Sequence, residues 1–135
     1  MKMSIQKYMS PGPHTIGQEQ TLSVAHSLMR QHGVRHLPVL EGGKLVGVLS
    51  QRDLHLIETL RDVDPATTTV DEAMTSDVYI TGPDAGLHEV ASKMAEHKYG
   101  SAVIVERGKV VGMFTTIDAL NILAELANVP SRASK

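Results

Sequence analysis

The chain has 135 residues, enough for one compact domain or for two small halves that share a core. Its composition, 41% hydrophobic and 21% charged with a net charge of −2, is ordinary for a globular protein and does not favour binding to nucleic acid or to an anionic membrane. It contains no cysteine, which excludes disulfides and thiolate chemistry, and no apolar run near the ~20 residues of a membrane-spanning helix. We therefore expect a cytoplasmic protein without a secretion signal.

Each half of the chain predicts the same order of elements. A short extended piece comes first, at 14–16 in the first half and at 78–80 in the second, followed by a turn and a helix. The first of these helices is expected to begin near Thr21, and its counterpart near Asp84. Their helical spacing predicts buried faces formed by Leu22, Ala25, Leu28 and Met29 in one, and by Leu87, Val90, Ala91 and Met94 in the other.

Two short strands around a tight turn, "EGGK" or "ERGK", come next and predict a β-hairpin in each half. The last helix opens at Ser50 in the first half and at Thr115 in the second. We expect these helices to carry their apolar residues at Leu54, Ile57 and Leu60, and at Leu120, Leu123 and Ala127.

The two halves match at an offset of 65 residues without a gap, so that Met9 coincides with Met74. One register held through so many segments predicts a duplicated unit. We expect a first repeat over residues 1–62, a linker over 63–69, a second repeat over 70–127 and a frayed tail over 128–135. The identical pairs include Gly17 with Gly82, Leu22 with Leu87, Met29 with Met94, His32 with His97, Gly47 with Gly112 and Asp53 with Asp118.

These elements predict an α+β fold of two β-α-β-β-α repeats. One repeat alone would be marginally stable, because it buries little apolar surface. We therefore expect the two repeats to pack sheet against sheet around a pseudo-twofold axis and to share one core.

A polar corner ends the second strand of each hairpin, as Ser50-x-x-Asp53 and as Thr115-x-x-Asp118. One interpretation is a helix capping box, in which the hydroxyl and the carboxylate satisfy backbone N–H groups of the first turn. Such a cap stabilises a helix by ~1 kcal/mol. We expect it to be present in both repeats.

The second interpretation adds a ligand at the same corner. A carboxylate accepts hydrogen bonds from both hydroxyls of a vicinal diol, and a helix N-terminus suits a phosphate, so the corner fits a nucleotide. Gly47 and Gly112 would let the opposing backbone approach closely. Both interpretations remain open at this point.

Long segments of the two repeats resemble a known family. With the lead-in segments "IQKYMS" and "VDEAMT", the stretches "RHLPVLEGGKLVGVLSQRDL" and "GSAVIVERGKVVGMFTTIDAL" are similar to a tandem pair of cystathionine-β-synthase (CBS) domains, a Bateman module. The resemblance implies the doubled fold with two clefts, and frequent head-to-head or head-to-tail dimers. It also implies regulatory binding of adenine nucleotides or adenosyl compounds.

Carried over to this sequence, the resemblance implies one cleft around Asp118, which would hold the ribose hydroxyls. Thr115 would lie near the ribose or the phosphate. Ser10 and Thr15 would border the base, with Ser101 opposite.

The second implied cleft centres on Asp53, which would hold the ribose of a second ligand. Ser50 and Arg52 would point toward its phosphate, and Thr75 and Ile80 would border its base.

Basic residues before the hairpin distinguish the two repeats. Arg35 and His36 occupy a position where the family often contacts phosphate, whereas the second repeat has Gly100 and Ser101 there. The second repeat also has Ile117 at the position of Arg52. The resemblance therefore implies two unequal clefts.

Seven histidines raise the alternative of a metal site. His32 and His36 are four residues apart, but Gly33 and the following strand interrupt the helix between them. The equivalent residues His32 and His97 are better explained by the helix C-termini near which they lie. We expect no metal site, although a site across a dimer stays open, and no hydrolase motif is recognisable.

We expect a regulatory module, not an enzyme, with no required cofactor and with AMP, ADP or ATP as its ligand. It would form a homodimer and act on a protein target that the sequence does not identify. The alternative is an interaction or dimerisation module with degenerate clefts, in which Asp53 and Asp118 only cap helices.

Overall fold

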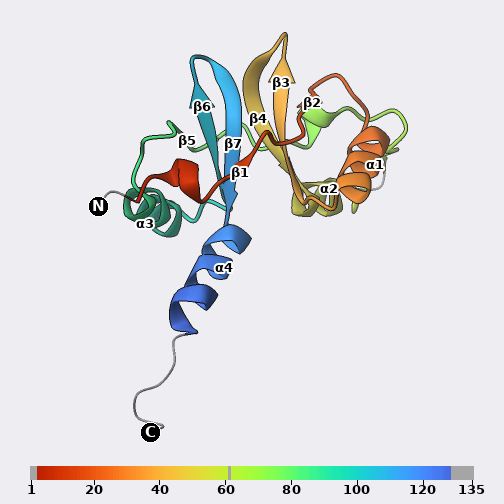
Figure 1. Ribbon diagram of the computed structural model, residues 1–135. Helices are drawn as coiled ribbons and strands as arrows, with labels where there is room; N and C mark the ends of the chain where they lie inside the picture. The colour runs from red at the N-terminus through yellow and green to blue at the C-terminus, as the bar shows by residue number, and fades with distance from the viewer. Residues whose placement is uncertain (1–2, 61, 129–135) are drawn as a thin grey trace, which may run out of the picture.

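The computed structural model describes residues 3–60 and 62–128, and shows two similar lobes side by side (Figure 1). Apart from Asn128, the predicted tail lies outside the described residues. Two short 3₁₀ helices, η1 (Ile5–Lys7) and η2 (Val70–Glu72), precede the repeated elements. The first lobe holds β2 (Ile16–Gly17), α1 (Leu22–His32), β3 (His36–Glu41), β4 (Lys44–Ser50) and α2 (Gln51–Ile57), and the second holds β1 (Ser10–Pro11), β5 (Ile80–Thr81), α3 (Leu87–His97), β6 (Ser101–Glu106), β7 (Lys109–Thr115) and α4 (Thr116–Ala127).

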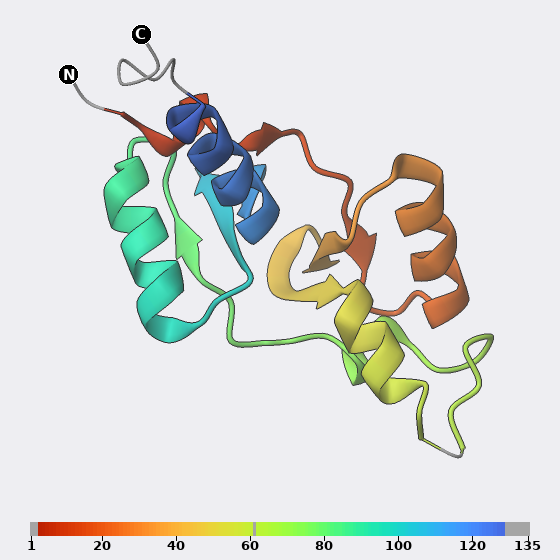
Figure 2. The same cartoon turned by 90° about the horizontal axis from the view of Figure 1, so that it is seen from below.

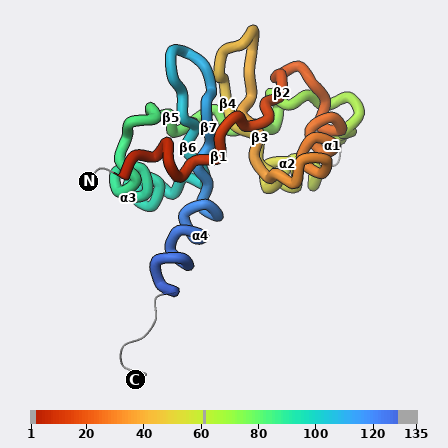
Figure 3. The backbone as a smooth tube through the Cα atoms, viewed as in Figure 1, coloured from red at the N-terminus to blue at the C-terminus, as the bar shows by residue number. Residues whose placement is uncertain are grey.

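Each lobe contains one small mixed sheet, with the strand order β2-β3-β4 in the first and β1-β7-β6-β5 in the second. The strand before each helix pairs parallel to the first hairpin strand, and the hairpin strands pair antiparallel. The two hairpins stand next to each other (Figure 3), and Val48, Val103 and Met113 form a buried cluster that joins β4 to the other sheet. This confirms the α+β fold of two repeats packed sheet to sheet.

The turns of both hairpins are confirmed as tight two-residue loops. Gly42 and Gly43 have φ values of +55° and +82°, and Arg107 and Gly108 have values of +53° and +76°. Positive φ at both central positions defines the type I′ turn, whose twist matches that of the flanking strands.

The N-terminal lead-in segment packs on the second lobe, not on the first. The N–H of Ile5 donates to the carbonyl of Ala85 at 2.7 Å, and the N–H of Leu87 donates to that of Met3, also at 2.7 Å. The Ile5 side chain is fully buried in the core of the second lobe. Figure 3 shows the chain crossing from there to β2.

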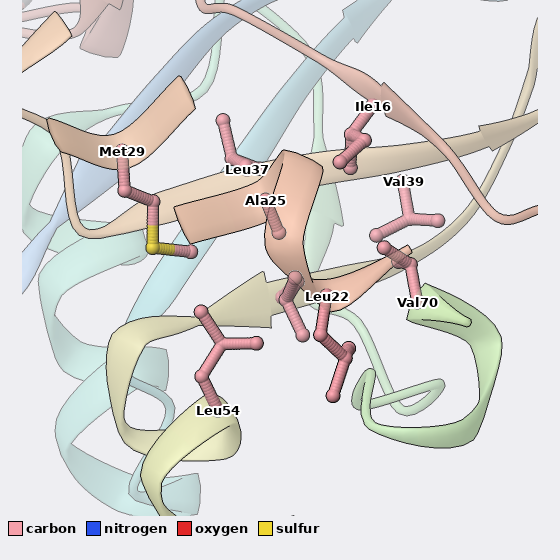
Figure 4. Packing of buried hydrophobic residues seen from close by; sticks show 9 residues of the cluster. Ile16, Leu22, Ala25, Met29, Leu37, Val39, Leu54 and Val70 are labelled. Atoms are coloured by element: carbon pink, nitrogen blue, oxygen red, sulfur yellow. The ribbon is translucent and has the colours of Figure 1, made fainter. Parts of the chain in front are cut away.

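The second lead-in makes the reciprocal connection to the first lobe. The N–H of Val70 donates to the carbonyl of Gln20 at 2.8 Å, and the N–H of Leu22 donates to that of Thr68 at 3.0 Å. Each lobe therefore closes its core with a segment from the other repeat. Figure 4 shows the first core, which contains Ile16, Leu22, Ala25, Met29, Leu37, Val39, Leu49, Leu54 and Val70.

Two helix boundaries differ from the prediction. α3 begins at Leu87, not near Asp84, because the Ala85 N–H turns back to the Gly82 carbonyl at 3.2 Å and the following residues bind the lead-in. α2 ends at Ile57, so Leu60 lies beyond it and is exposed.

The apolar residues expected on α4 are present, but Leu120 and Leu123 do not face the core. Their exposed fractions are 57% and 59%, and that of Leu126 is 63%. Only a narrow strip with Ala119 and Ile122 packs against the second core, because the helix leads away from the lobes. Figure 1 shows α4 extending downward from the end of β7, away from the lobes, and Figure 2 views the molecule from that side.

Candidate functional site

Two clefts lie between the lobes, and each contains one of the predicted aspartates. The Asp53 cleft has a volume of about 460 Å³, within the range of small-molecule sites. Its lining residues come from both repeats, because β4 and α2 face residues 75–79 and residues 98–101, which lead into β6. They are Arg35, His36, Val48, Ser50, Gln51, Arg52, Asp53, Thr75, Asp77, Val78, Tyr79, Lys98, Tyr99, Gly100 and Ser101.

The Asp118 cleft is the pseudo-symmetric counterpart, with a volume of about 540 Å³. It also draws on both repeats, since β7 and α4 face the lead-in and the end of α1. Its lining residues are Ser10, Pro11, Gly12, Pro13, His14, His32, Gly33, Val34, Arg35, His36, Met113, Thr115, Ile117 and Asp118.

Both polar corners form the predicted capping boxes. The Ser50 N–H donates to Asp53 Oδ2 at 2.8 Å, and the Asp53 N–H donates to Ser50 Oγ at 3.0 Å. At the other corner the Thr115 N–H donates to Asp118 Oδ2 at 2.9 Å, and the Asp118 N–H donates to Thr115 Oγ1 at 3.3 Å. Each box uses only one carboxylate oxygen.

The second oxygen of each carboxylate is outside the box, and each aspartate lines its cleft. Thr75 Oγ1 donates to Asp53 Oδ1 at 3.4 Å, a long contact that a stronger donor can replace. The capping role is therefore compatible with a ligand at the same side chain, and the ligand itself stays a prediction.

Gly47 and Gly112 let an opposing segment of the chain approach closely, as predicted, and in each case that segment is a lead-in. A Cβ on Gly47 would lie 2.7 Å from Met74 Sδ and 2.9 Å from the Thr75 carbonyl oxygen. A Cβ on Gly112 would collide with the Met9 side chain. The missing side chains let each lead-in lie on the opposite strand, which brings Ser10 and Thr75 to the cleft edges.

Most of the predicted site residues lie where the sequence placed them. Ser10, Thr115 and Asp118 line one cleft, whereas Ser50, Arg52, Asp53 and Thr75 line the other. Arg35 and His36 line both.

Three predicted residues lie elsewhere. Ser101 lines the Asp53 cleft, not the Asp118 cleft, because its strand faces the first lobe there. Thr15 and Ile80 line neither cleft, and their preceding neighbours His14 and Tyr79 do so instead. Successive side chains of an extended chain point to opposite sides, so an error of one residue reverses the direction.

Two tyrosines in the Asp53 cleft were not predicted. The rings of Tyr79 and Tyr99 stack with centroids 5.4 Å apart, which gives the cleft an aromatic wall. Burial, with Glu89 nearby, raises the pKa of Tyr79, so its phenol stays protonated. The repeat offset could have found them, since Tyr79 is equivalent to His14 and Tyr99 to Val34, both of which line the other cleft.

His36 is the half-buried histidine that both clefts share. Burial lowers its pKa below the ordinary 6.5, and the nearby Arg35 acts in the same direction. Asp53 and Asp118 oppose that shift, one from each cleft. The pKa of His36 therefore depends on carboxylates in both clefts.

Two histidines of the Asp118 cleft lie together. His14 and His32 stack with ring centroids 3.5 Å apart, and His32 is the last residue of α1 as predicted. Within residues 3–60 and 62–128, no cluster of three or more His, Asp or Glu side chains is arranged to hold a metal ion. None of the described helices is long and apolar enough to cross a membrane.

Comparison with known sequences identifies both repeats. The profile of the CBS domain matches residues 5–56 and 70–125. The CBS domain-containing protein YhcV of Bacillus subtilis is 34% identical over 110 residues, which cover 82% of this chain and 78% of that protein.

Solved structures agree with the fold. A Vibrio cholerae protein assigned to acetoin utilization, AcuB, superposes with a TM-score of 0.81 at 33% identity, over 94% of both chains. The CBS domain pair of protein MJ0100, solved with 5′-methylthioadenosine and S-adenosyl-L-methionine, has a TM-score of 0.78 at 25% identity. That match covers 90% of this chain and 99% of the MJ0100 chain.

Proposed function

The chain belongs to the CBS domain family, with two CBS domains in tandem, and from this premise we propose that it is a regulatory module for an adenine nucleotide or adenosyl compound. AMP, ADP and ATP are the first candidates. The observation that carries the proposal is the pair of aspartates, each of which lines a cleft and caps a helix with only one of its two carboxylate oxygens. The adenosyl ligands of the MJ0100 pair support the same ligand class.

In this proposal the carboxylate of Asp53 or Asp118 accepts hydrogen bonds from the two ribose hydroxyls. Arg35 and Arg52 face the phosphate, and the Tyr79–Tyr99 wall packs against the base in the Asp53 cleft. A ligand held between the lobes changes their relative position to the extent that it binds one arrangement more tightly. The module then reports ligand level to a protein partner.

Calorimetry with AMP, ADP, ATP and S-adenosylmethionine tests ligand binding. We expect Asp53→Asn and Asp118→Asn to weaken binding in their own cleft by about tenfold or more, the loss typical of a hydrogen bond to a charged group. The asparagine oxygen still accepts in the capping box, so the helices remain capped.

Thr21→Ala is the matched control. Thr21 caps α1, with its Oγ1 accepting a hydrogen bond from the Val24 N–H at 3.4 Å, and it lines neither cleft. This variant should lose ~1 kcal/mol of stability and retain ligand affinity. If the wild-type protein binds none of these compounds at millimolar concentration, the proposal is wrong.

We further propose that the module is a homodimer whose copies meet at α4. On α4, the side chains of Leu120, Leu123 and Leu126 each expose more than half of their surface, and exposed apolar surface of this kind favours association. On α2, Leu56 is a further exposed leucine, with an exposed fraction of 60%. A second copy of the chain presents the same face, as a twofold interface requires.

Light scattering tests the dimer. The wild-type chain should have twice the monomer mass of 14.6 kDa, and Leu120→Glu with Leu123→Glu should shift it to the monomer. Asn121→Glu, on the polar side of the same helix, is the control that should remain dimeric. If the protein is dimeric but binds no adenosyl compound, this would support the alternative, an interaction module with degenerate clefts.

A further inference from the structure

One loop residue, Arg35, belongs to both clefts. It lies between α1 and β3, and it lines the Asp53 cleft as well as the Asp118 cleft. Its equivalent in the second repeat, Gly100, lines only the Asp53 cleft and has no side chain to offer. The pseudo-twofold relation between the clefts is therefore broken at this position.

The backbone around these two positions is nevertheless equivalent. The Arg35 carbonyl accepts a hydrogen bond from the Gln51 N–H at 2.9 Å, and the Gly100 carbonyl accepts one from the Thr116 N–H at 3.2 Å. A Cβ on Gly100 would lie 3.9 Å from His36 Nε2, in ordinary contact. The asymmetry is therefore one of side chains, and position 100 has room for one.

The other arginine and the lysine that line a cleft are also on one side. The Asp53 cleft has Arg52 and Lys98, whereas the Asp118 cleft has Ile117 and Gly33 at the equivalent positions. Among the described residues that line the Asp118 cleft, Arg35 is the one arginine or lysine.

We propose that the two clefts share Arg35 as their phosphate partner, so that a phosphorylated nucleotide in the Asp53 cleft leaves the Asp118 cleft suited to an adenine nucleoside without phosphate. This inference rests on the proposed function and assigns a ligand class to each cleft. A guanidinium that holds one phosphate in a bidentate geometry has used its best-aligned donors and its single positive charge, so a second phosphate in the opposite cleft finds a weaker partner and a like charge nearby. Since the loss of such a contact costs tenfold or more in affinity, the second phosphorylated ligand binds correspondingly more weakly.

The tyrosines provide a signal specific to one cleft. The chain has three tyrosines and no tryptophan, and Tyr79 and Tyr99 line the Asp53 cleft. Tyr8 packs against the core of the second lobe and lines neither cleft. Tyrosine fluorescence therefore reports binding in the Asp53 cleft, while calorimetry reports both.

The experiment titrates the full chain with AMP and, separately, with adenosine. We expect AMP to bind in two steps at least tenfold apart, with the fluorescence change complete in the first, and adenosine to bind in two steps of similar affinity. Arg35→Gln should weaken the first AMP step about tenfold and leave the second AMP step and adenosine unchanged.

Gly100→Arg is the gain-of-function variant, because it adds a second guanidinium to the Asp53 cleft and leaves Arg35 to the phosphate in the Asp118 cleft. It should strengthen the second AMP step by about tenfold, and Gly100→Gln, which adds bulk without charge, should not. Two AMP steps of equal affinity in the wild-type protein, or an Arg35→Gln effect on both steps, would overturn the sharing while leaving the proposed function intact. Absence of binding by both AMP and adenosine would overturn the sharing, and the proposed function would fail as well if ADP, ATP and S-adenosylmethionine also do not bind.

Discussion

At the scale of single residues, Asp53 and Asp118 have a structural role and a candidate binding role at once. The spacing Ser/Thr-x-x-Asp predicted the capping boxes, and both are present. The same spacing could not show that one oxygen remains outside each box, since that depends on where the lead-in and the opposite lobe lie. Thr15 and Ile80 illustrate the same limit, because a repeat register gives a position but not the direction of a side chain.

His36 gives a prediction for stability against pH. Because burial lowers its pKa, the unfolded chain takes up a proton at a higher pH than the folded chain does. The contribution of neutral His36 to stability is therefore complete above about pH 6.5 and is lost as the pH falls toward the lowered value. In urea unfolding at about pH 7.5 and pH 5.5, His36→Gln should lose less stability on acidification than the wild-type chain.

The exposed histidine His88 on α3 provides the control for this measurement. His88→Gln should keep the wild-type slope of stability against pH. An unchanged slope in His36→Gln would show that this side chain does not couple folding to protonation.

At the scale of elements, the sequence was most successful where a local pattern decides the structure. Helical spacing located α1 and α3, and the glycine turns located both hairpins. It also located the N-cap of α4 at Thr115, but the apolar residues of this helix, which have the spacing of a core helix, lie mostly in solvent. Periodicity identifies an apolar face and does not identify what covers it.

The glycines of β4 and β7 give a prediction at this scale. Gly47→Ala should lower the free energy of unfolding by about 1–3 kcal/mol, because its Cβ would overlap the backbone of Thr75, which cannot move without the lead-in. The displaced Thr75 should also weaken ligand binding in the Asp53 cleft. Urea unfolding and calorimetry measure the two effects.

Gly82→Ala is the matched substitution, because a Cβ there would meet nothing within 4 Å. It should be close to neutral in stability and in affinity. If Gly47→Ala is as stable as Gly82→Ala, the close approach of the lead-in is not required by the fold.

At the scale of the whole molecule, the repeated unit in the sequence and the packed unit in space differ. The repeat predicted the doubled fold, but it could not show which lobe each lead-in completes, because the two lead-ins are equivalent by sequence. Ile5 and Val70 settle this, since each is fully buried in the lobe of the other repeat.

Two fragments of similar length test whether the packed unit or the sequence repeat folds better. Residues 13–76 contain the complete first core, including Val70, whereas residues 1–62 follow the sequence repeat and lack it. We expect 13–76 to show more helical circular dichroism and a more cooperative urea transition than 1–62, because an open core loses buried apolar area. Equal behaviour of the two fragments would contradict the importance of the exchange.

The crossed lead-ins also constrain how such a molecule can evolve. A harmful change in one lead-in damages the half of the protein encoded elsewhere in the gene, so selection acts on the two copies together. Deletion of either repeat would remove part of the hydrophobic core of the remaining one. Once each lead-in packs in the lobe of the other repeat, neither repeat can easily be lost in evolution.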